Sequence, residues 1–401
     1  MRIYNAASEE TLRARGLLKD WRADGFISAE QYERLEKEAA SDLRTTNVFL
    51  RLVLFIFTLI SIGAAVGLLS ITVLSGASQQ TSGIFLLIFA VVCYAASEFA
   101  VSRFRLYRHG IEEALTVCAV GFLCAGMQAA FFGGVIYSHT SAARFVVPAA
   151  GAAFSLWIWR RFGLWYALPA AMIFVIFVPD YWSVPHAAQR VIIAMLYAAG
   201  LVCVATARSR HRGEYLENVY SLAEAFLWLG IYLAFNLQLS SLSWAMRGWG
   251  GGRVLPEFGS AFYWTTWVLI WCLPVIVLAG GIRQKNRAVI GAGLIMAVLT
   301  SISNKPYLGW PRHTWDPMLL GLLLAGVAIF VRRWLDSGPG QERHGFTAER
   351  LSAKDKDLLK AGSGVLGLLT PNSITPAPQA SRTGVTFAGG SSGGGGASSE
   401  F

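Results

Sequence analysis

Three glutamates in apolar stretches of the sequence are the residues best placed to do chemistry. Glu98, Glu113 and Glu224 each stand within or at the edge of a long hydrophobic run. Burying an ionisable side chain in a membrane is costly, so such residues usually serve a function. Glu217, Ser221 and Glu224 also recur at i, i+4 and i+7, on one helical face. If their segments converge, the carboxylates of Glu98, Glu113 and Glu224 predict an intramembrane proton or cation site, because neighbouring negative charges favour uptake of positive charge.

An alternative interpretation gives each of these carboxylates a basic partner. Arg103, Arg105 and Arg212 lie near the ends of the same apolar stretches. Salt bridges to them would neutralise the glutamates near the membrane surface. The two interpretations differ in whether the three carboxylates lie together or apart.

A second group of polar and aromatic residues lies in two loops between apolar stretches. Lysine and arginine supply charge and tryptophan supplies a stacking surface, a combination that could bind an anionic sugar, a lipid headgroup or a peptide. The alternative is an aromatic belt, because Trp and Tyr favour both membrane interfaces. The candidate ligand contacts in the loop 304–316 are Lys305, Trp310, Arg312, His313 and Asp316, and the loop 238–258 adds Trp244, Arg247, Trp249, Arg253 and Glu257.

Familiar catalytic motifs are absent from the sequence. It contains no G-x-S-x-G, H-E-x-x-H, P-loop or Rossmann fingerprint. The six histidines are scattered, and the five cysteines lie in apolar stretches without a C-x-x-C pair. We therefore expect no metal, no cofactor and no disulfide framework, and an enzyme is the less favoured class.

The composition is that of a polytopic membrane protein. Of 401 residues, 54% are hydrophobic and 14% are charged, whereas about a quarter of an ordinary soluble domain is charged. This excludes a disordered chain, a disulfide-stapled mini-protein and a conventional soluble enzyme. The net charge of +10 comes from the middle of the chain, since residues 1–48 and 335–401 are nearly neutral. A nucleic-acid partner is not expected, because the basic residues form short clusters between apolar runs rather than one soluble face.

The elements that must position these residues are membrane-spanning helices. A span needs about 20 apolar residues, and ten segments of the sequence approach this. The fold class predicted is therefore all-α, a bundle of about ten transmembrane helices. The segments are Leu52–Leu74, Ile84–Val101, Ala114–Phe132, Ala142–Trp159, Phe162–Val178, Val191–Thr206, Val219–Asn236, Ala261–Gly280, Ala288–Ile302 and Met318–Val331.

The basic residues between these segments predict an orientation. Cytoplasmic loops carry an excess of Lys and Arg, and the loops alternate between rich and poor in them. With the N-terminus inside, fourteen basic residues face the cytoplasm and six face outward, which predicts that both termini are cytoplasmic. No cleavable signal peptide is expected, because the first apolar run follows a charged segment and is too long. The inner residues are Arg51, Arg103, Arg105, Arg108, Arg160, Arg161, Arg208, Arg210, Arg212, Arg283, Lys285, Arg287, Arg332 and Arg333, and the outer ones are Arg144, Arg190, Arg247, Arg253, Lys305 and Arg312.

Residues 8–42 read as a helical hairpin before the first span. Ser28 followed by Gln31 fits a capping box at the start of the second helix. Apolar positions recur on both helices: Leu12, Leu17, Leu18 and Trp21 on the first, Tyr32, Leu35 and Ala39 on the second. The hairpin is either a packing element at the bilayer surface or a docking site for a cytoplasmic protein partner.

The stretch Trp21–Gln31, W-R-A-D-G-F-I-S-A-E-Q, carries a family resemblance. With the charged helix and the apolar stretch that follow, it resembles the start of a group of uncharacterised bacterial polytopic membrane proteins. Members of that group have a short cytosolic hairpin with a W-x-x-x-G-x-I-S-x-E-Q-like stretch and a domain of unknown function. The resemblance implies a multi-pass protein of the bacterial inner membrane, and it transfers no catalytic or binding residue.

The predicted domains are a cytosolic hairpin (1–48), a transmembrane domain (49–334) and a cytosolic tail (335–401). We expect one short amphipathic helix at 348–359 in the tail and a disordered Gly/Ser-rich end. Within the transmembrane domain, Gly63-x-x-x-Gly67 and the small-residue run 149–153 would allow close helix contacts.

Three classes of function remain open from the sequence. The first is a non-catalytic sensor, scaffold or envelope-associated factor that works through its soluble ends. The second is a secondary transporter of a small molecule or lipid, possibly proton-coupled, because ten spans divide into five plus five and an odd number inverts the second half. The third is an intramembrane enzyme that acts on lipid or lipid-linked sugar. Internal symmetry and the surroundings of Glu224 distinguish the second class from the first.

Overall fold

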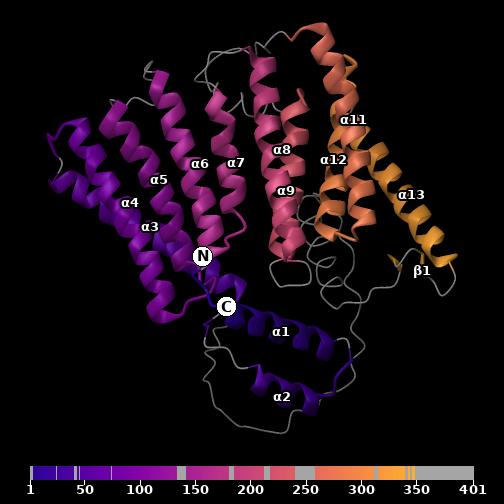
Figure 1. The fold of residues 1–401 in the computed structure, drawn as a ribbon, viewed down its shortest axis with the longest axis horizontal. Helices are drawn as coiled ribbons and strands as arrows, with labels where there is room; N and C mark the ends of the chain where they lie inside the picture. The colour runs from indigo at the N-terminus through magenta and orange to yellow at the C-terminus, as the bar shows by residue number, and fades with distance from the viewer. Residues whose placement is uncertain are drawn as a thin grey trace, which may run out of the picture. The chain divides into compact units, whose positions relative to one another are not determined.

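The fold is all-helical, as the sequence predicts (Figure 1). The structure is a computed structural model that describes residues 3–23, 25–39, 43–44, 46–73, 75–132, 141–179, 185–211, 217–239, 258–310, 315–338, 342–343 and 346–347. Contacts divide the chain into one unit, Met1–Ala348, and a second, Glu349–Phe401, which lies outside the described residues. The predicted tail helix at 348–359 and the Gly/Ser-rich end also lie outside them.

The N-terminal hairpin forms as the sequence predicts. Its helices are α1 (Ala6–Ala23) and α2 (Ala29–Glu38). Gly25 adopts a φ of +79° in the turn between them, a conformation that glycine adopts readily. The capping box is present: the Gln31 amide donates to Ser28 Oγ at 3.2 Å, and the Ser28 amide donates to Gln31 Oε1 at 2.9 Å. The guanidinium of Arg22 lies 4.8 Å from the ring centre of Tyr32, which joins the two helices.

Among the described residues, ten further helices follow, one at each predicted segment. Consecutive helices form packed hairpins, α4 with α5, α6 with α7, α8 with α9, and α11 with α12 (Figure 1). In addition, α3 and α6 pack on α5, and α9 packs on α11 and α12. The helices are α3 (Val48–Val73), α4 (Gln79–Phe104), α5 (Ile111–Phe132), α6 (Ser141–Phe162), α7 (Ala167–Phe177), α8 (His186–Arg210), α9 (Glu217–Phe235), α11 (Ser260–Arg283), α12 (Arg287–Tyr307) and α13 (Asp316–Asp336).

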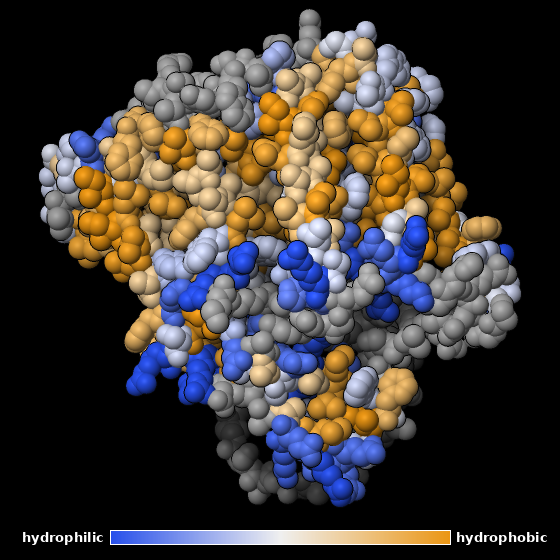
Figure 2. All heavy atoms as spheres, viewed as in Figure 1, coloured by the Kyte–Doolittle hydropathy of each residue, from blue (hydrophilic) through white to orange (hydrophobic). Residues whose placement is uncertain are grey.

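In the described part of the chain, the helices that could span a membrane number six to eight rather than the ten predicted. Six helices among the described residues are long and apolar enough to cross a membrane, namely α3, α4, α5, α8, α11 and α12. Two shorter apolar helices, Ala167–Phe177 of α7 and Val219–Phe235 of α9, could add to them. Apolar side chains cover the helices while hydrophilic ones gather over the hairpin and the adjoining helix ends (Figure 2). The chain is an integral, multi-pass membrane protein.

Helix length and internal charges explain why the predicted count is too high. At about 1.5 Å per residue, the 11 residues of α7 measure about 17 Å, well short of a hydrocarbon core of about 30 Å. Arginines within α6 and charged residues at both ends of α13 leave only the uncharged stretches 145–159 and 317–331, each about 22 Å long. The sequence marks these segments as apolar, but the helices that form are short or include charge.

The closest helix contact lies between α4 and α5 and not where the glycine motif predicts it. A methyl group built on Gly83 would lie 2.1 Å from the Ala130 backbone nitrogen, so only glycine fits there. By contrast, no atom lies within 4 Å of a methyl group on Gly63 or Gly67. No other described helix uses the close approach that Gly63-x-x-x-Gly67 allows, so a contact at this motif stays a prediction. The small-residue run of α6 does allow close packing, since a methyl on Gly151 would lie 2.8 Å from the Phe174 ring.

The hairpin pairs do not repeat with a period of five helices. In the first five helices of the bundle, α3 to α7, the packed hairpins are second with third and fourth with fifth. In the next five, α8 to α13, they are first with second and third with fourth. The helices α4 to α7 form two consecutive hairpins, and so do α8, α9, α11 and α12. The packing order of these two sets of four agrees, whereas that of the two sets of five does not.

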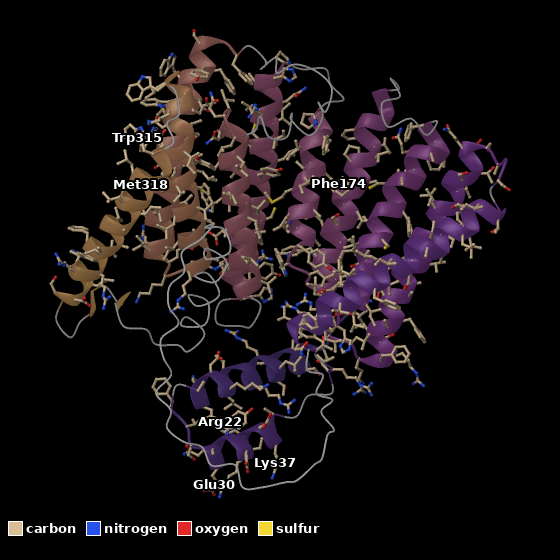
Figure 3. All side chains as sticks on the ribbon, turned by 180° about the vertical axis from the view of Figure 1, so that it is seen from behind. Arg22, Glu30, Lys37, Phe174, Trp315 and Met318 are labelled. Carbon is tan, nitrogen blue, oxygen red and sulfur yellow. The ribbon has the colours of Figure 1, made fainter. Side chains whose placement is uncertain are left out.

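The end of the described chain adds a small strand pair. β1 (Glu342–Arg343) and β2 (Phe346–Thr347) are two-residue antiparallel strands next to α13. Most large apolar side chains of α13 are exposed, among them Met318, Leu322 and Phe330 (Figure 3 labels Met318). Lipid would cover such a surface in a membrane.

Candidate functional site

Glu113 forms a buried ion pair that joins α3 to α5. Arg51 Nε donates to Glu113 Oε2 at 2.9 Å, and a second guanidinium nitrogen contacts Oε1, so the pair is bidentate. The Glu113 side chain is 5% exposed. Gly110 makes this approach possible: with a φ of +100°, it lies so close to α3 that a methyl group would be 2.2 Å from the Arg51 carbonyl oxygen. Glu113 thus serves as the negative partner of a salt bridge that joins α3 to α5.

Glu98 joins α4 to α6 through a hydrogen-bonded chain. Arg161 Nε donates to Glu98 Oε1 at 2.8 Å, and the Tyr94 hydroxyl donates to the same oxygen at 2.7 Å. The Trp157 indole N–H donates in turn to the Tyr94 hydroxyl at 2.8 Å. One third of the Glu98 side chain is exposed, so this carboxylate lies at the edge of the bundle.

Glu224 lies deeper and links three helices. Arg208 lies on α8, and its Nη1 donates two hydrogen bonds. One goes to Oε2 of Glu224 on α9 at 2.9 Å, and the other goes to Oε1 of Gln284 at the end of α11 at 2.7 Å. Both members of the ion pair are largely buried, with side chains 14% and 8% exposed. Glu224 therefore faces other helices and not lipid.

The three glutamates lie on three different helix interfaces. The structure pairs each with its own arginine, and the partners are Arg51, Arg161 and Arg208 instead of the Arg103, Arg105 and Arg212 considered from the sequence. No group of three His, Cys, Asp or Glu side chains in the described part of the chain could hold a metal ion. Binding of a proton or cation by Glu98, Glu113 and Glu224 stays a prediction, and it would require at least one ion pair to open.

A fourth glutamate, Glu112, was not predicted and is the most buried of all. It is fully buried at the first turn of α5, where Oε1 accepts a hydrogen bond of 2.6 Å from the His109 backbone N–H. Its other oxygen, Oε2, has no hydrogen-bond partner among the described residues, and the same holds for the hydroxyl of Tyr4. The only sequence signal was its position beside Glu113 at the start of an apolar stretch.

Tyr4 brings the beginning of the chain into contact with this region. It is 5% exposed and packs with Val101, Ile158 and Phe162 at the ends of α4 and α6. Burial raises the pKa of the Tyr4 phenol above its ordinary value, and the charge of Glu112 adds to that effect. The phenol therefore stays protonated in the folded protein.

Backbone hydrogen bonds hold the hairpin to the bundle at both of its ends. Before α1, the Ile3 amide donates to the Arg161 carbonyl at 3.0 Å. After α2, the Arg44 amide donates to the Arg105 carbonyl at 2.9 Å, and the Tyr107 amide donates to the Arg44 carbonyl at 3.0 Å. We call these two attachments the hairpin tethers. Arg161 takes part twice, since its side chain also holds Glu98.

Between the tethers, the hairpin keeps an exposed apolar surface. Leu18 and Tyr32 are buried between the helices, whereas Trp21 is 45% exposed and Phe26 is 68% exposed. With the exposed Leu17 and Leu35, they form what we call the hairpin patch: Leu17, Trp21, Phe26 and Leu35. Clusters of this kind on soluble segments often mark contact surfaces.

At the opposite end of the bundle, the structure brings only part of the predicted ligand site together. Lys305 forms an ion pair with Asp316, and its ammonium lies 5.3 Å from the ring centre of Trp315 (Figure 3 labels Trp315). Trp310 is 61% exposed and contacts Lys305 through its backbone N–H. Arg312 and His313 lie outside the described residues, as do the five predicted contacts in the loop 238–258, so ligand binding there stays a prediction.

A buried polar network between α9, α11 and α12 was also not predicted. The Asn236 amide donates to the Tyr232 hydroxyl and to Ser303 Oγ, each at 2.9 Å. The Tyr232 hydroxyl lies 2.9 Å from Thr300 Oγ1, which donates to the Ile270 carbonyl at 2.7 Å. Such hydrogen bonds join helices inside a membrane. None of these side chains carries a charge, so they do not stand out in the sequence as ionisable residues do.

Comparison with known proteins gives one short similarity. No protein family model matches the chain, and no solved structure shows significant similarity to it. A stretch of 77 residues, 19% of the chain, is 34% identical to a glycine betaine/proline/ectoine/pipecolic acid transporter of Dickeya dadantii. The matched stretch covers 14% of that transporter, so the chain is similar to a small part of it.

Proposed function

We propose that this protein is a non-catalytic sensor or scaffold of the bacterial inner membrane, which presents its N-terminal hairpin to a cytoplasmic protein partner. The observation that carries the proposal is the pair of hairpin tethers. They fix both ends of the hairpin to the ends of α4 and α6, while the hairpin patch between them stays exposed. A change in the packing of these helices would therefore move the hairpin patch, which is the surface that contacts the partner.

The ion pairs support this proposal because they fix helices instead of leaving reactive groups free. Glu98, Glu113 and Glu224 each hold an arginine from a neighbouring helix. Arg161 couples one of these pairs directly to the first tether, since its carbonyl accepts from Ile3. A stimulus that moves α4 against α6 would strain the Glu98–Arg161 pair and the tether together.

The orientation belongs to the same proposal. Basic residues gather in the last turns of α4, α6, α8 and α11 and in the turns after α4 and α11. The tethers join the hairpin to the last turn of α6 and to the turn after α4. The rule that basic loops stay inside then places the hairpin in the cytoplasm. We propose that the C-terminus lies on the same side, which requires an even number of spans.

Photo-crosslinking in cells tests the proposal. With p-benzoylphenylalanine in place of Trp21, we expect one discrete adduct with another protein, and the Leu17→Glu variant should lose it because the patch becomes charged. The matched control places the same probe at Glu33, an exposed residue of α2 outside the patch. Equal crosslinking at Trp21 and Glu33, or none at Trp21, would contradict the proposal.

A second candidate function is transport of a small zwitterionic solute. Its specific support is the 77-residue similarity to the betaine and proline transporter, together with the burial of Glu224 between helices. The packing order of the helices speaks against the five-plus-five inverted form of this hypothesis. Uptake of radiolabelled glycine betaine into proteoliposomes, driven by a proton gradient and abolished in Glu224→Gln, would favour transport over the scaffold.

A further inference from the structure

A small cavity lies where two groups of described helices meet, α3 to α7 and α8 to α13. It has a volume of about 200 Å³, and residues of the α4–α5 and α6–α7 turns are among those that line it. Its walls come from both groups, with Trp159, Trp165 and Leu168 on one side and Leu222 and Phe226 of α9 on the other. Arg108, in the α4–α5 turn, also lines it.

The cavity exists because the seam between the groups is sparsely packed. The helix α7 meets α8 and α9 over a much smaller surface than it shares with α6. Aromatic rings bridge the seam instead: Trp165 stacks on Phe226 with ring centres 6.1 Å apart, and Trp159 meets Tyr220 edge-on at 6.0 Å. Tryptophan at a helix end is typical of the headgroup level of a membrane. The cavity thus lies at the depth where headgroup and acyl chain meet.

Arg108 supplies a single positive charge to an otherwise apolar cavity. Its backbone adopts the left-handed conformation, with a φ of +51°. Its guanidinium lies 5.4 Å from the ring centre of Tyr107, and no carboxylate in the described part of the chain forms an ion pair with it. The planar donors of arginine match a phosphate group.

We propose that this cavity binds an anionic phospholipid, with the phosphate of the headgroup on Arg108 and part of one acyl chain between Leu168, Leu222 and Phe226. A volume of about 200 Å³ is below the roughly 300–1,000 Å³ of sites that enclose a small molecule. A segment of an acyl chain fits, and the rest of the lipid stays in the bilayer. The lipid completes the packing of the seam, and this holds whether the protein is a scaffold or a transporter.

Native mass spectrometry of the purified full chain tests this proposal. The probes are palmitoyl-oleoyl phosphatidylglycerol and the matching phosphatidylcholine, added to delipidated protein. Both lipids carry the phosphate, but phosphatidylcholine also carries the positive charge of choline, which Arg108 repels. We therefore expect one phosphatidylglycerol to bind about fivefold more tightly than phosphatidylcholine, the size of one exposed charge interaction. Arg108→Gln should abolish the preference, and Leu222→Trp should weaken binding of both lipids by filling the cavity.

The control removes the same charge at the same end of the bundle. Arg103 is exposed in the last turn of α4 and does not line the cavity, so Arg103→Gln should keep the preference. Equal losses in Arg103→Gln and Arg108→Gln, or equal binding of both lipids to the unaltered protein, would overturn the proposal. Displacement of phosphatidylglycerol by inorganic phosphate would overturn it as well, because a free anion would then occupy the site. If Leu222→Trp does not fold, the comparison of Arg103→Gln with Arg108→Gln alone tests the proposal.

Discussion

At the scale of single residues, charge in this protein is used to join helices. Glu113 with Arg51 and Glu224 with Arg208 form buried pairs between different helices, and each pair forms near a helix end. A buried pair contributes little compared with an apolar contact, but removing one partner leaves a buried charge without compensation. Loss of either arginine should therefore destabilise the bundle as much as loss of the glutamate with which it pairs.

Replacing Glu113 by Ala should destabilise the bundle by about 3 kcal/mol, because Arg51 would keep its charge without a partner. The measurement is unfolding of the purified protein in detergent by added dodecyl sulfate. Glu30→Ala is the control, since the Glu30–Arg34 pair is exposed and should contribute less than about 1 kcal/mol. Equal effects of the two substitutions would contradict a structural role for the buried pair.

The Tyr4 phenol should make the attachment of the hairpin sensitive to high pH. Burial raises its pKa above the ordinary value of about 10. As the pH rises past about 10, the unfolded chain loses this proton before the folded one does, so the folded state loses stability. Thermal unfolding between pH 8 and 11 should show this fall in the unaltered protein and less of it in Tyr4→Phe. The same fall in Tyr4→Phe would show that another group titrates.

At the scale of elements, close helix contact is set by a few small residues. Gly83 on α4 lets the α5 backbone approach at Ala130, while Gly63 on α3 faces no neighbour within the described structure. Both glycines stand in equally apolar stretches, and Gly63 has the stronger motif. A motif shows that a helix can be approached closely, but the partner helix decides whether it is.

Gly83→Ala should destabilise the α4–α5 hairpin by at least about 2 kcal/mol, because the new methyl group would overlap backbone atoms. Gly63→Ala should change stability by no more than about 0.5 kcal/mol. Unfolding in dodecyl sulfate measures both. A larger effect at Gly63 than at Gly83 would point to a helix contact on α3 that the single chain does not contain.

The sequence predicts the positions of the elements well and their contacts poorly. Every predicted apolar segment forms a helix, and the capping box at Ser28 and Gln31 forms as expected, because periodicity and capping are local properties. The partners of Glu98, Glu113 and Glu224 depend on which helices pack together, and a single sequence does not contain that information. The burial of Glu112 and the network around Asn236 were missed for the same reason.

At the scale of the whole molecule, the chain is a membrane bundle that carries a small soluble surface. The described part of the bundle has six to eight candidate spans, and the hairpin belongs to the same compact unit. The count was overestimated because hydropathy measures composition and not the length of the helix that forms, as α7 demonstrates. The function proposed here depends on the side of the membrane that the hairpin faces.

Cysteine labelling tests that orientation. In a variant whose five native cysteines are replaced by alanine, a cysteine at Ser28 should react with a membrane-impermeant maleimide only after the cells are opened. A cysteine at Trp310, at the opposite end of the bundle, should react in intact cells. The reverse pattern would place the hairpin outside and contradict the proposed cytoplasmic partner.

The coupling of the hairpin to the bundle is the central claim, and amide hydrogen exchange in lipid nanodiscs measures it most directly. We expect slow exchange at the Ile3 and Arg44 amides in the unaltered protein, because both donate to carbonyls of the bundle. Exchange at Ile3 should become faster in Glu98→Gln, which weakens the hold on Arg161. Two results together would show that the hairpin is not coupled to the bundle. The Ile3 and Arg44 amides would exchange as fast as those in the exposed turn around Gly25, and Glu98→Gln would leave their exchange rates unchanged.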